Sequence, residues 1–265
     1  IGPEGARALA ASPNVLGLQE LDFDHNRIGD EGAKALASSD KLVTLRKLHL
    51  RGSNIGAEGS EALANSNGLS ELEELDLIYN HIGDRGAQAV ADSRYLQDLK
   101  KLSLRNNNIH NEGVEALANS KNLSKLRNLD LHGNKIGDQG LRFLASSQYL
   151  MNLRDLNLGW NMVGDAGAEA LSTSTQLPRL RNLDLNGNQI GDQGFRALVD
   201  SEQRSQLLVL DLAWNHIDDQ ALEILRTSNR LKQLRILRLQ GNRIARSVQE
   251  KLRALPQLQE LELQL

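Results

Sequence analysis

The sequence predicts an α/β solenoid in which a parallel sheet lines one side and short helices cover the other. Three observations predict this fold. One pattern of residues recurs every 27 positions along almost all of the 265 residues. Each recurrence begins with alternating apolar and polar residues, which is typical of a strand, and continues with the spacing of a helix. Hydrophobic residues make up 40% of the chain and aromatic residues 3%, so the core must be aliphatic.

The first element of each unit is a short strand with one buried face, as in Leu48, His49 and Leu50. A strand and helix this small cannot bury their apolar faces alone, so neighbouring units must stack. All strands should therefore be parallel neighbours in one continuous sheet. We expect ten strands, centred near residues 21–23, 48–50, 75–77, 102–104, 129–131, 156–158, 183–185, 210–212, 237–239 and 261–263.

A polar column follows the strands, where the chain turns and leaves backbone groups without partners. An asparagine amide supplies two donors and an acceptor, so it can bridge to the neighbouring turn. We expect Asn134, for example, to be buried and bonded on both sides. Ser53 should weaken its own position in the column. The column reads Asn26, Ser53, Asn80, Asn107, Asn134, Asn161, Asn188, Asn215 and Asn242.

The second element of each unit is a helix that we expect to begin at an N-capping Asp or Asn and to end near a serine. The serine hydroxyl can satisfy local backbone groups at the helix end. Ala57 and Arg246 interrupt the capping column. Recurrent glycines, such as Gly29, indicate positive φ or close approach of helix and strand. The capping column reads Asp30, Asp84, Asn111, Asp138, Asp165, Asp192 and Asp219.

The unit L-x-x-L-x-L-x-x-N-x-I-G-D-x-G-A-x-A-L-A resembles the leucine-rich repeat family over essentially the whole chain. Its G-D-x-G-A-x-A-L-A half resembles the ribonuclease-inhibitor-like subclass, with 27-residue repeats. The resemblance implies a right-handed β/α horseshoe, with strands on the concave wall, helices outside and an asparagine ladder. Helices are about 10 Å wide and strands about 4.8 Å apart, which also predicts curvature with the helices outside.

We expect one array over residues 1–265, with about nine full units and partial units at both ends. Ile1 lies inside a unit, and open parallel edges are usually covered, so we expect the intact protein to continue past at least one end. We expect a monomer unless these edges pair. Four substitutions depart from the pattern near the carboxyl end: Arg204 for Leu, Arg246 for Asp, Val248 for Gly and Leu255 for Ser.

Composition and motifs exclude several functions. A net charge of −3 and a pI near 6.1 argue against nucleic-acid binding, and no apolar run reaches the roughly 18 residues of a membrane span. Cysteine is absent. The sequence holds no phosphate-binding glycine motif, no G-x-S-x-G and no H-E-x-x-H. We therefore expect no enzyme, no cofactor and no metal, and a cytoplasmic location, or the host cytosol for a secreted effector.

The amino-terminal half of the concave wall alternates in charge from one strand to the next. This pattern predicts cross-strand ion pairs that stabilise the register, and we favour that interpretation over a binding role. The acidic units carry Glu20, Asp22 and Asp24, then Glu73, Glu74 and Asp76, and the basic units carry Arg46, Lys47, His49 and Arg51, then Lys100, Lys101 and Arg105.

The carboxy-terminal half carries exposed aromatic and acidic columns. Trp160 and Trp214 share the column before the ladder asparagine, two units or about 10 Å apart, and Tyr79 belongs to the same column. These rings either form a binding surface or pack against neighbouring turns. Asp184 and Asp211 are adjacent like charges, which destabilises the fold unless Arg181, a cation or a partner compensates. The other interpretation is that Asp here is merely a soluble residue.

We therefore predict a protein-interaction module whose partner surface on the concave face centres on Tyr79, Trp160, Asp184, Asp211 and Trp214. Aromatic residues bury much area with few rotors to freeze, and the carboxylates would favour a partner with Lys or Arg. The expected setting is a larger bacterial protein or a secreted effector. The alternative is the regulatory or sensor array of a receptor or of a GTPase-activating protein.

Overall fold

A computed structural model describes residues 1–228, 230, 232–253, 258 and 260–265, so Leu255 lies outside the described residues. Within this part of the chain, ten strands form one parallel sheet in chain order. The predicted sheet is therefore confirmed. The strands are β1 (Glu20–Asp22), β2 (Lys47–His49), β3 (Glu74–Asp76), β4 (Lys101–Ser103), β5 (Asn128–Asp130), β6 (Asp155–Asn157), β7 (Asn182–Asp184), β8 (Val209–Asp211), β9 (Ile236–Arg238) and β10 (Glu262–Gln264).

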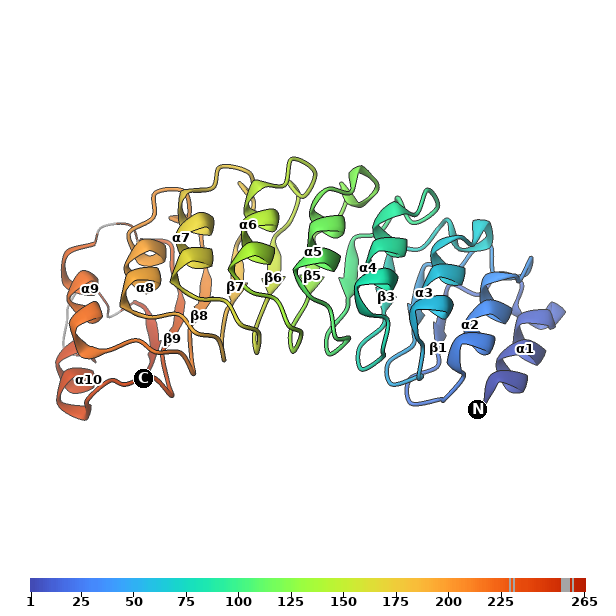
Figure 1. Cartoon of the computed structure of the whole chain (residues 1–265), viewed down its shortest axis with the longest axis horizontal. Helices are drawn as coiled ribbons and strands as arrows, with labels where there is room; N and C mark the ends of the chain where they lie inside the picture. Colours follow the sequence, from blue (N-terminus) through green and yellow to red (C-terminus); the bar gives the residue numbers. More distant parts are fainter. Residues whose placement is uncertain (229, 231, 254–257, 259) are drawn as a thin grey trace.

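Figure 1 shows the helices side by side in a curved row, with the strands behind them. This is the predicted solenoid with a concave sheet and convex helices. The α-helices are α1 (Pro3–Ala11), α2 (Gly29–Ala37), α3 (Ala57–Ala64), α4 (Gly83–Asp92), α5 (Asn111–Ala118), α6 (Asp138–Ser146), α7 (Asp165–Thr173), α8 (Asp192–Val199), α9 (Ile224–Thr227) and α10 (Arg246–Arg253). The 3₁₀ turns are η1 (Pro13–Val15), η2 (Asn67–Leu69), η3 (Lys121–Leu123) and η4 (Asp219–Glu223).

The strand boundaries differ from the predicted ones by a single residue. Nine strands begin one residue earlier than predicted, and β10 begins one residue later. Leu21, Leu48 and Leu75 are paired in register and buried, so each leucine column stacks along the core between sheet and helices. The alternation of buried leucine and polar residues therefore positions the polar residues on the open concave face.

The predicted asparagine ladder forms, but the Asn134 side chain bonds its own unit and the preceding unit rather than the units on both sides. The Asn134 Nδ2 atom donates to the Leu104 carbonyl of the preceding unit at 3.0 Å and to its own Leu131 carbonyl at 2.9 Å. Its Oδ1 atom accepts from the Ile109 amide at 3.0 Å. Ser53 donates to the Phe23 carbonyl at 2.9 Å, and the amide of the preceding turn bonds backbone instead. Ser53 therefore supplies fewer bonds than an asparagine.

The predicted role of the aspartates as caps of their own helices is wrong. Asp138 is the first residue of α6, and its Oδ1 atom accepts from the amides of Gly164 and Gly167, at 2.7 and 2.9 Å, in the first turn of α7. The stacked helices bring the next amino terminus within reach of this carboxylate, where its charge also favours the helix dipole. The same bonds to the following unit are made by Asp30, Asp84, Asn111 and Asp165.

The serines likewise act between units rather than only locally. Ser66 follows α3, and its hydroxyl donates to the Ala37 carbonyl, in the last turn of α2, at 2.6 Å. Serines from Ser39 to Ser201 repeat this bond to the preceding helix. In most helices, side chains of the neighbouring units thus bond the free backbone amides at the start and the free carbonyls at the end. These bonds couple the units along the array.

The backbone conformation of the glycine at the start of each helix depends on whether the preceding unit supplies a capping Asp or Asn. Pro3 and Ala57 stand where the other units up to Asp219 carry Asp or Asn. In the following units, Gly29 and Gly83 adopt φ of +61° and +59°, and their amides donate to backbone carbonyls instead. Where a cap is present, as at Gly137, the backbone is extended, with φ −101°.

This difference predicts opposite responses to one substitution. Gly83→Ala should lower the free energy of unfolding by about 1–2 kcal/mol, because an alanine at positive φ is strained. Gly137→Ala should leave it unchanged or raise it slightly, because the added Cβ meets nothing closer than 3.8 Å and the unfolded chain loses freedom. Urea unfolding of the two variants checks this, and equal effects would contradict it.

Candidate functional site

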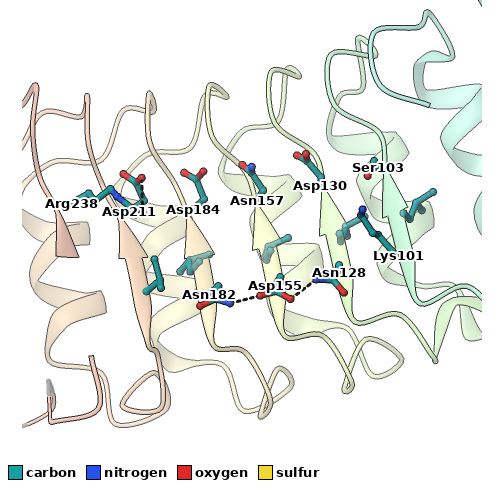
Figure 2. Close-up of a pocket in the computed structure, with 15 residues that line it drawn as sticks. Lys101, Ser103, Asn128, Asp130, Asp155, Asn157, Asn182, Asp184, Asp211 and Arg238 are labelled. Carbon is teal, nitrogen blue, oxygen red and sulfur yellow. Dashed lines mark hydrogen bonds and ion pairs between the residues drawn. The ribbon is translucent and has the colours of Figure 1, made fainter. Parts of the chain in front are cut away.

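A shallow hollow of about 260 Å³ lies on the concave face over β4 to β9 (Figure 2). Two rows of polar side chains line this concave hollow, each row crossing neighbouring strands. The lower row comprises Lys101, Asn128, Asp155 and Asn182, and the upper row comprises Ser103, Asp130, Asn157, Asp184, Asp211 and Arg238. The apolar Val209, in register with Asn182, follows the lower row on β8.

The lower row is held by amide–carboxylate hydrogen bonds. The Asp155 carboxylate accepts from the side-chain amides of Asn128 and Asn182, one on each neighbouring strand. The amides thereby turn their carbonyl oxygens away from Asp155. Our sequence reasoning missed this row. The signal was present, because the residue before each strand leucine changes from charged in the first four units to Asn, Asp and Asn in the next three.

In the upper row, aspartates use one carboxylate oxygen to accept a hydrogen bond from the backbone. The Asp184 Oδ1 atom accepts from the Asn186 amide at 2.9 Å, and the Asp211 Oδ1 atom accepts from the Ala213 amide at 3.0 Å. Asp130 binds the His132 amide in the same way at 3.0 Å. These aspartates therefore order the turn after each strand. They have a structural role and are not merely soluble residues.

Arg238, rather than Arg181, pairs with one of the two adjacent carboxylates. Asp184 and Asp211 are paired in register, but Arg181 donates to the Gln206 side chain at 2.8 Å. Arg238 lies 3.5 Å from the Asp211 Oδ2 atom. Arg181 precedes β7 and bonds the Gln206 side chain. Arg238 instead lies in the upper row, next to Asp211. Arg181, one of the three possible compensating groups that the sequence left open, therefore does not compensate the pair.

Burial raises the pKa of the Asp211 carboxyl above its usual value, and the Asp184 carboxylate raises it further, against the opposing effects of the Ala213 amide and of Arg238. Burial also raises the pKa of Asp130. Both carboxylates are thus less favourably solvated in the folded chain than in water, and a donor or cation that reaches them would restore what burial removes.

The raised pKa predicts a pH-dependent effect of Asp211→Asn. The amide keeps the acceptor for Ala213 and removes the charge beside Asp184, so the variant should be more stable at neutral pH by about 0.5 kcal/mol. A raised carboxyl pKa means that the wild type recovers stability as the pH falls and Asp211 is protonated. Urea unfolding should show the advantage at neutral pH and no advantage at about pH 3. An advantage independent of pH would contradict the assignment.

The tryptophans lie at the turns after β6 and β8, outside the concave hollow. Trp160 and Trp214 are 58% and 60% exposed, yet both rings lie on a glycine of the next unit. A Cβ at Gly187 would be 2.9 Å from the Trp160 ring, and one at Gly241 would be 2.5 Å from the Trp214 ring. The tryptophans therefore both pack against a turn and expose a face. The two interpretations of the sequence are not exclusive.

Both tryptophans occupy backbone conformations that favour glycine. Trp160 has φ +53° and Trp214 has φ +56°, while glycines occupy this column at positions 52, 133, 187 and 241. Such strain costs on the order of 1 kcal/mol for a side chain with a Cβ, and it persists where the surroundings impose it. Met162, 46% exposed and two residues after Trp160, adds apolar surface that our sequence reasoning missed. Trp160, Met162 and Trp214 are called the tryptophan rim below.

The structure brings most of the predicted site residues together but separates one. The Trp160 amide donates to the Asn186 carbonyl at 2.7 Å, and Asn186 is the residue that Asp184 orders. The tryptophan rim therefore adjoins the upper row of the concave hollow. Tyr79 is 42% exposed, follows β3, and lies against Arg51, whose guanidinium is 5.2 Å from the ring centre. It is three units from Trp160.

The expected ion pairs form across the amino-terminal strands. Lys47 lies 3.1 Å from Glu20, and Lys101 lies 2.6 Å from Glu74. A second row pairs Lys100 with Glu73 at 2.7 Å. This half of the wall neutralises itself. The acceptor-rich surface over β5 to β8 is therefore distinct from it.

The described residues hold no group of three or more His, Cys, Asp or Glu side chains that could bind a metal ion. Nor does any helix among them have the length and apolar character needed to cross a membrane.

Comparison with known proteins finds one family and one fold. A family model described as leucine rich repeat matches residues 18–37, 41–64, 70–91, 95–118, 122–145, 149–172, 177–199 and 205–223. No match is found among curated proteins. A crystal structure described as that of a TDR receptor is similar, with a TM-score of 0.56 and 16% sequence identity. The similarity covers 99% of this chain and 45% of the receptor chain. This chain belongs to the leucine-rich repeat family, whose arrays are in general protein-binding scaffolds and not enzymes.

Proposed function

We propose that residues 1–265 form a single array that binds a protein partner on the concave face. The partner surface comprises Trp160, Asp184, Asp211 and Trp214, with Tyr79 at its far edge. One observation carries this proposal: the acceptor-rich hollow adjoins two exposed tryptophans that occupy a strained backbone conformation. Large exposed aromatic residues beside polar groups are typical of binding hot spots.

The partner should present lysine or arginine. The upper row holds three aspartates, and one of them, Asp211, pairs with Arg238. The lower row adds Asp155. An incoming guanidinium could bind the carboxylates and stack on a tryptophan face. Such contacts between charges steer association and weaken with salt.

The setting of the array is also a proposal. The G-D-x-G-A-x-A-L-A units support the ribonuclease-inhibitor-like subclass with 27-residue repeats. We place the array in a larger bacterial protein or a secreted effector, monomeric, and acting in the cytoplasm or the host cytosol. The alternative is a sensor array of a receptor or GTPase-activating protein, which the likeness to a receptor structure supports loosely.

Selection from a displayed peptide library tests the chemistry. Peptides enriched on the wild-type array should be rich in Lys and Arg and should bind more weakly as salt rises. Asp184→Asn with Asp211→Asn should lose most of this binding, because amides keep the turn bonds but remove the charge. Glu4→Gln with Glu31→Gln removes the same charge from helices α1 and α2 and should change nothing. Enrichment of acidic peptides, or equal binding by both variants, would refute the proposal.

A further inference from the structure

A row of arginines precedes the strands that carry the lower row of the concave hollow. Arg127, Arg154 and Arg181 are the residues directly before β5, β6 and β7. The Arg154 amide donates to the Arg127 carbonyl and the Arg181 amide to the Arg154 carbonyl, both at 2.8 Å, so the three residues are direct neighbours across the sheet. Such neighbours lie about 4.8 Å apart. These three residues are called the arginine row below.

The same position neutralises itself in the preceding units. Arg46, Glu73 and Lys100 stand directly before β2, β3 and β4. Glu73 lies 3.9 Å from Arg46 and 2.7 Å from Lys100. Side chains at this position therefore reach their neighbours along the row, and an alternation of sign turns that contact into ion pairs.

The arginine row lacks such acidic neighbours. The four residues that lead into each of its strands, 124–127, 151–154 and 178–181, include no Asp or Glu. Within the described residues, no carboxylate forms a salt bridge with any of the three guanidinium groups. Arg181 donates to the Gln206 side chain instead, whereas Arg127 and Arg154 are exposed. Because like charges on neighbouring strands destabilise their pairing, a bound anion would stabilise the row.

The sign of the charge changes along the strands of the hollow. In the lower row, which follows the arginine row, the Asp155 carboxylate is already engaged by the two neighbouring side-chain amides. The upper row carries Asp130 and Asp184, each three residues after an arginine of the row, or about 10 Å along the strand (Figure 2). The concave face over β5 to β7 is thus basic where the strands begin and acidic where they end.

We propose that the partner segment on the concave face carries Asp or Glu residues about 10 Å from the Lys or Arg residues that meet the upper row, and that these acidic residues bind the arginine row. This inference rests on the proposed function and adds the orientation of the partner. A guanidinium can bind a carboxylate through two parallel hydrogen bonds. Exposed pairs of this kind each contribute little. The arginine row therefore orients and strengthens a partner that the hollow holds, and does not by itself retain an acidic peptide.

Extended versions of a selected basic peptide test the pairing. Three glutamates are added to its amino terminus in one peptide and to its carboxyl terminus in another, with glutamines in the matched peptides. One glutamate peptide should bind about tenfold more tightly than its glutamine counterpart at low salt. The other should gain much less, because its extension points away from the arginine row. Equal gains at both ends, or no gain at either end, would overturn the proposal.

Substitutions in the array assign the gain to the arginine row. Arg127→Gln with Arg154→Gln should bind the glutamate peptide and its glutamine counterpart equally. Arg85→Gln with Arg142→Gln removes the same charge from helices α4 and α6 on the convex side and should keep the gain. A gain that survives in the first variant, or that is lost in both, would contradict the assignment to the row.

Side-chain NMR of the free array decides the outcome even if no basic peptide binds, a result that would count against the proposed function alone. A free triglutamate peptide at low salt should shift the Nε–Hε resonances of Arg127 and Arg154 and leave that of Arg142 unchanged. Absence of these shifts would overturn the proposal. Shifts caused by a short single-stranded oligonucleotide, but not by triglutamate, would assign the row to nucleic acid and overturn it as well.

Discussion

Replacing Trp160 and Trp214 together with glycine should lower the affinity for a selected basic peptide by about 100-fold or more, because truncating a hot-spot aromatic residue typically costs about 2 kcal/mol. The melting temperature should move little. Glycine relieves the strain at φ +53° and +56°, which offsets the lost packing on Gly187 and Gly241. Alanine is the poorer test, because it loses the ring and keeps the strain.

A matched control is available in the same column. His25 has φ +58° and lies against Gly52 as Trp160 lies against Gly187, but it belongs to the first unit. His25→Gly should leave peptide affinity unchanged. If the tryptophans serve packing alone, the double variant will melt earlier and bind as well as the wild type. Calorimetric titration and thermal melting distinguish the two outcomes.

Asn134→Ala should be the most destabilising single change that we predict, lowering the free energy of unfolding by about 3 kcal/mol. The substitution leaves the Ile109 amide and the Leu104 and Leu131 carbonyls without the partner that Asn134 provides, in a site where this side chain is 8% exposed. Water cannot readily replace these bonds, so the buried groups keep their desolvation cost.

Urea unfolding measures this effect, and the control is Asn65→Ala. Asn65 is exposed after α3, where its amide donates to the Glu61 carbonyl, so its loss should cost less than about 0.5 kcal/mol. An Asn134→Ala midpoint equal to that of Asn65→Ala would end the ladder argument.

The strands and the ladder were predictable because each depends on one repeated residue type at one position. The leucine column of Leu48 and the asparagine column of Asn134 repeat from unit to unit, with Ser53 as the departure, so the pattern alone assigns their faces. The capping aspartates were predictable in position but not in partner. Asp138 reaches the next helix because stacking fixes the distance between units, and no single unit encodes that distance.

The site was predictable in part for the same reason. The Trp column and the Asp184–Asp211 pair could be read from the period, but the side chain that compensates Asp211 could not. The repeat pattern placed both Arg181 and Arg238 close to the two aspartates. Only the direction of each side chain in the structure showed that Arg238 lies in the upper row. The packing of Trp160 on Gly187 likewise depends on the positive φ of both turns.

Hydroxyl-radical footprinting of the array with a selected peptide tests the concave binding surface most directly. Trp160, Met162 and Trp214 are exposed and readily oxidised, and so are Tyr149 and Met151 in the loop before β6. Binding should protect the tryptophan rim from oxidation and leave Tyr149 and Met151 as reactive as in the free chain. Protection of Tyr149 and Met151, with Trp160 and Trp214 still oxidised at the free rate, would contradict the assignment of the partner surface.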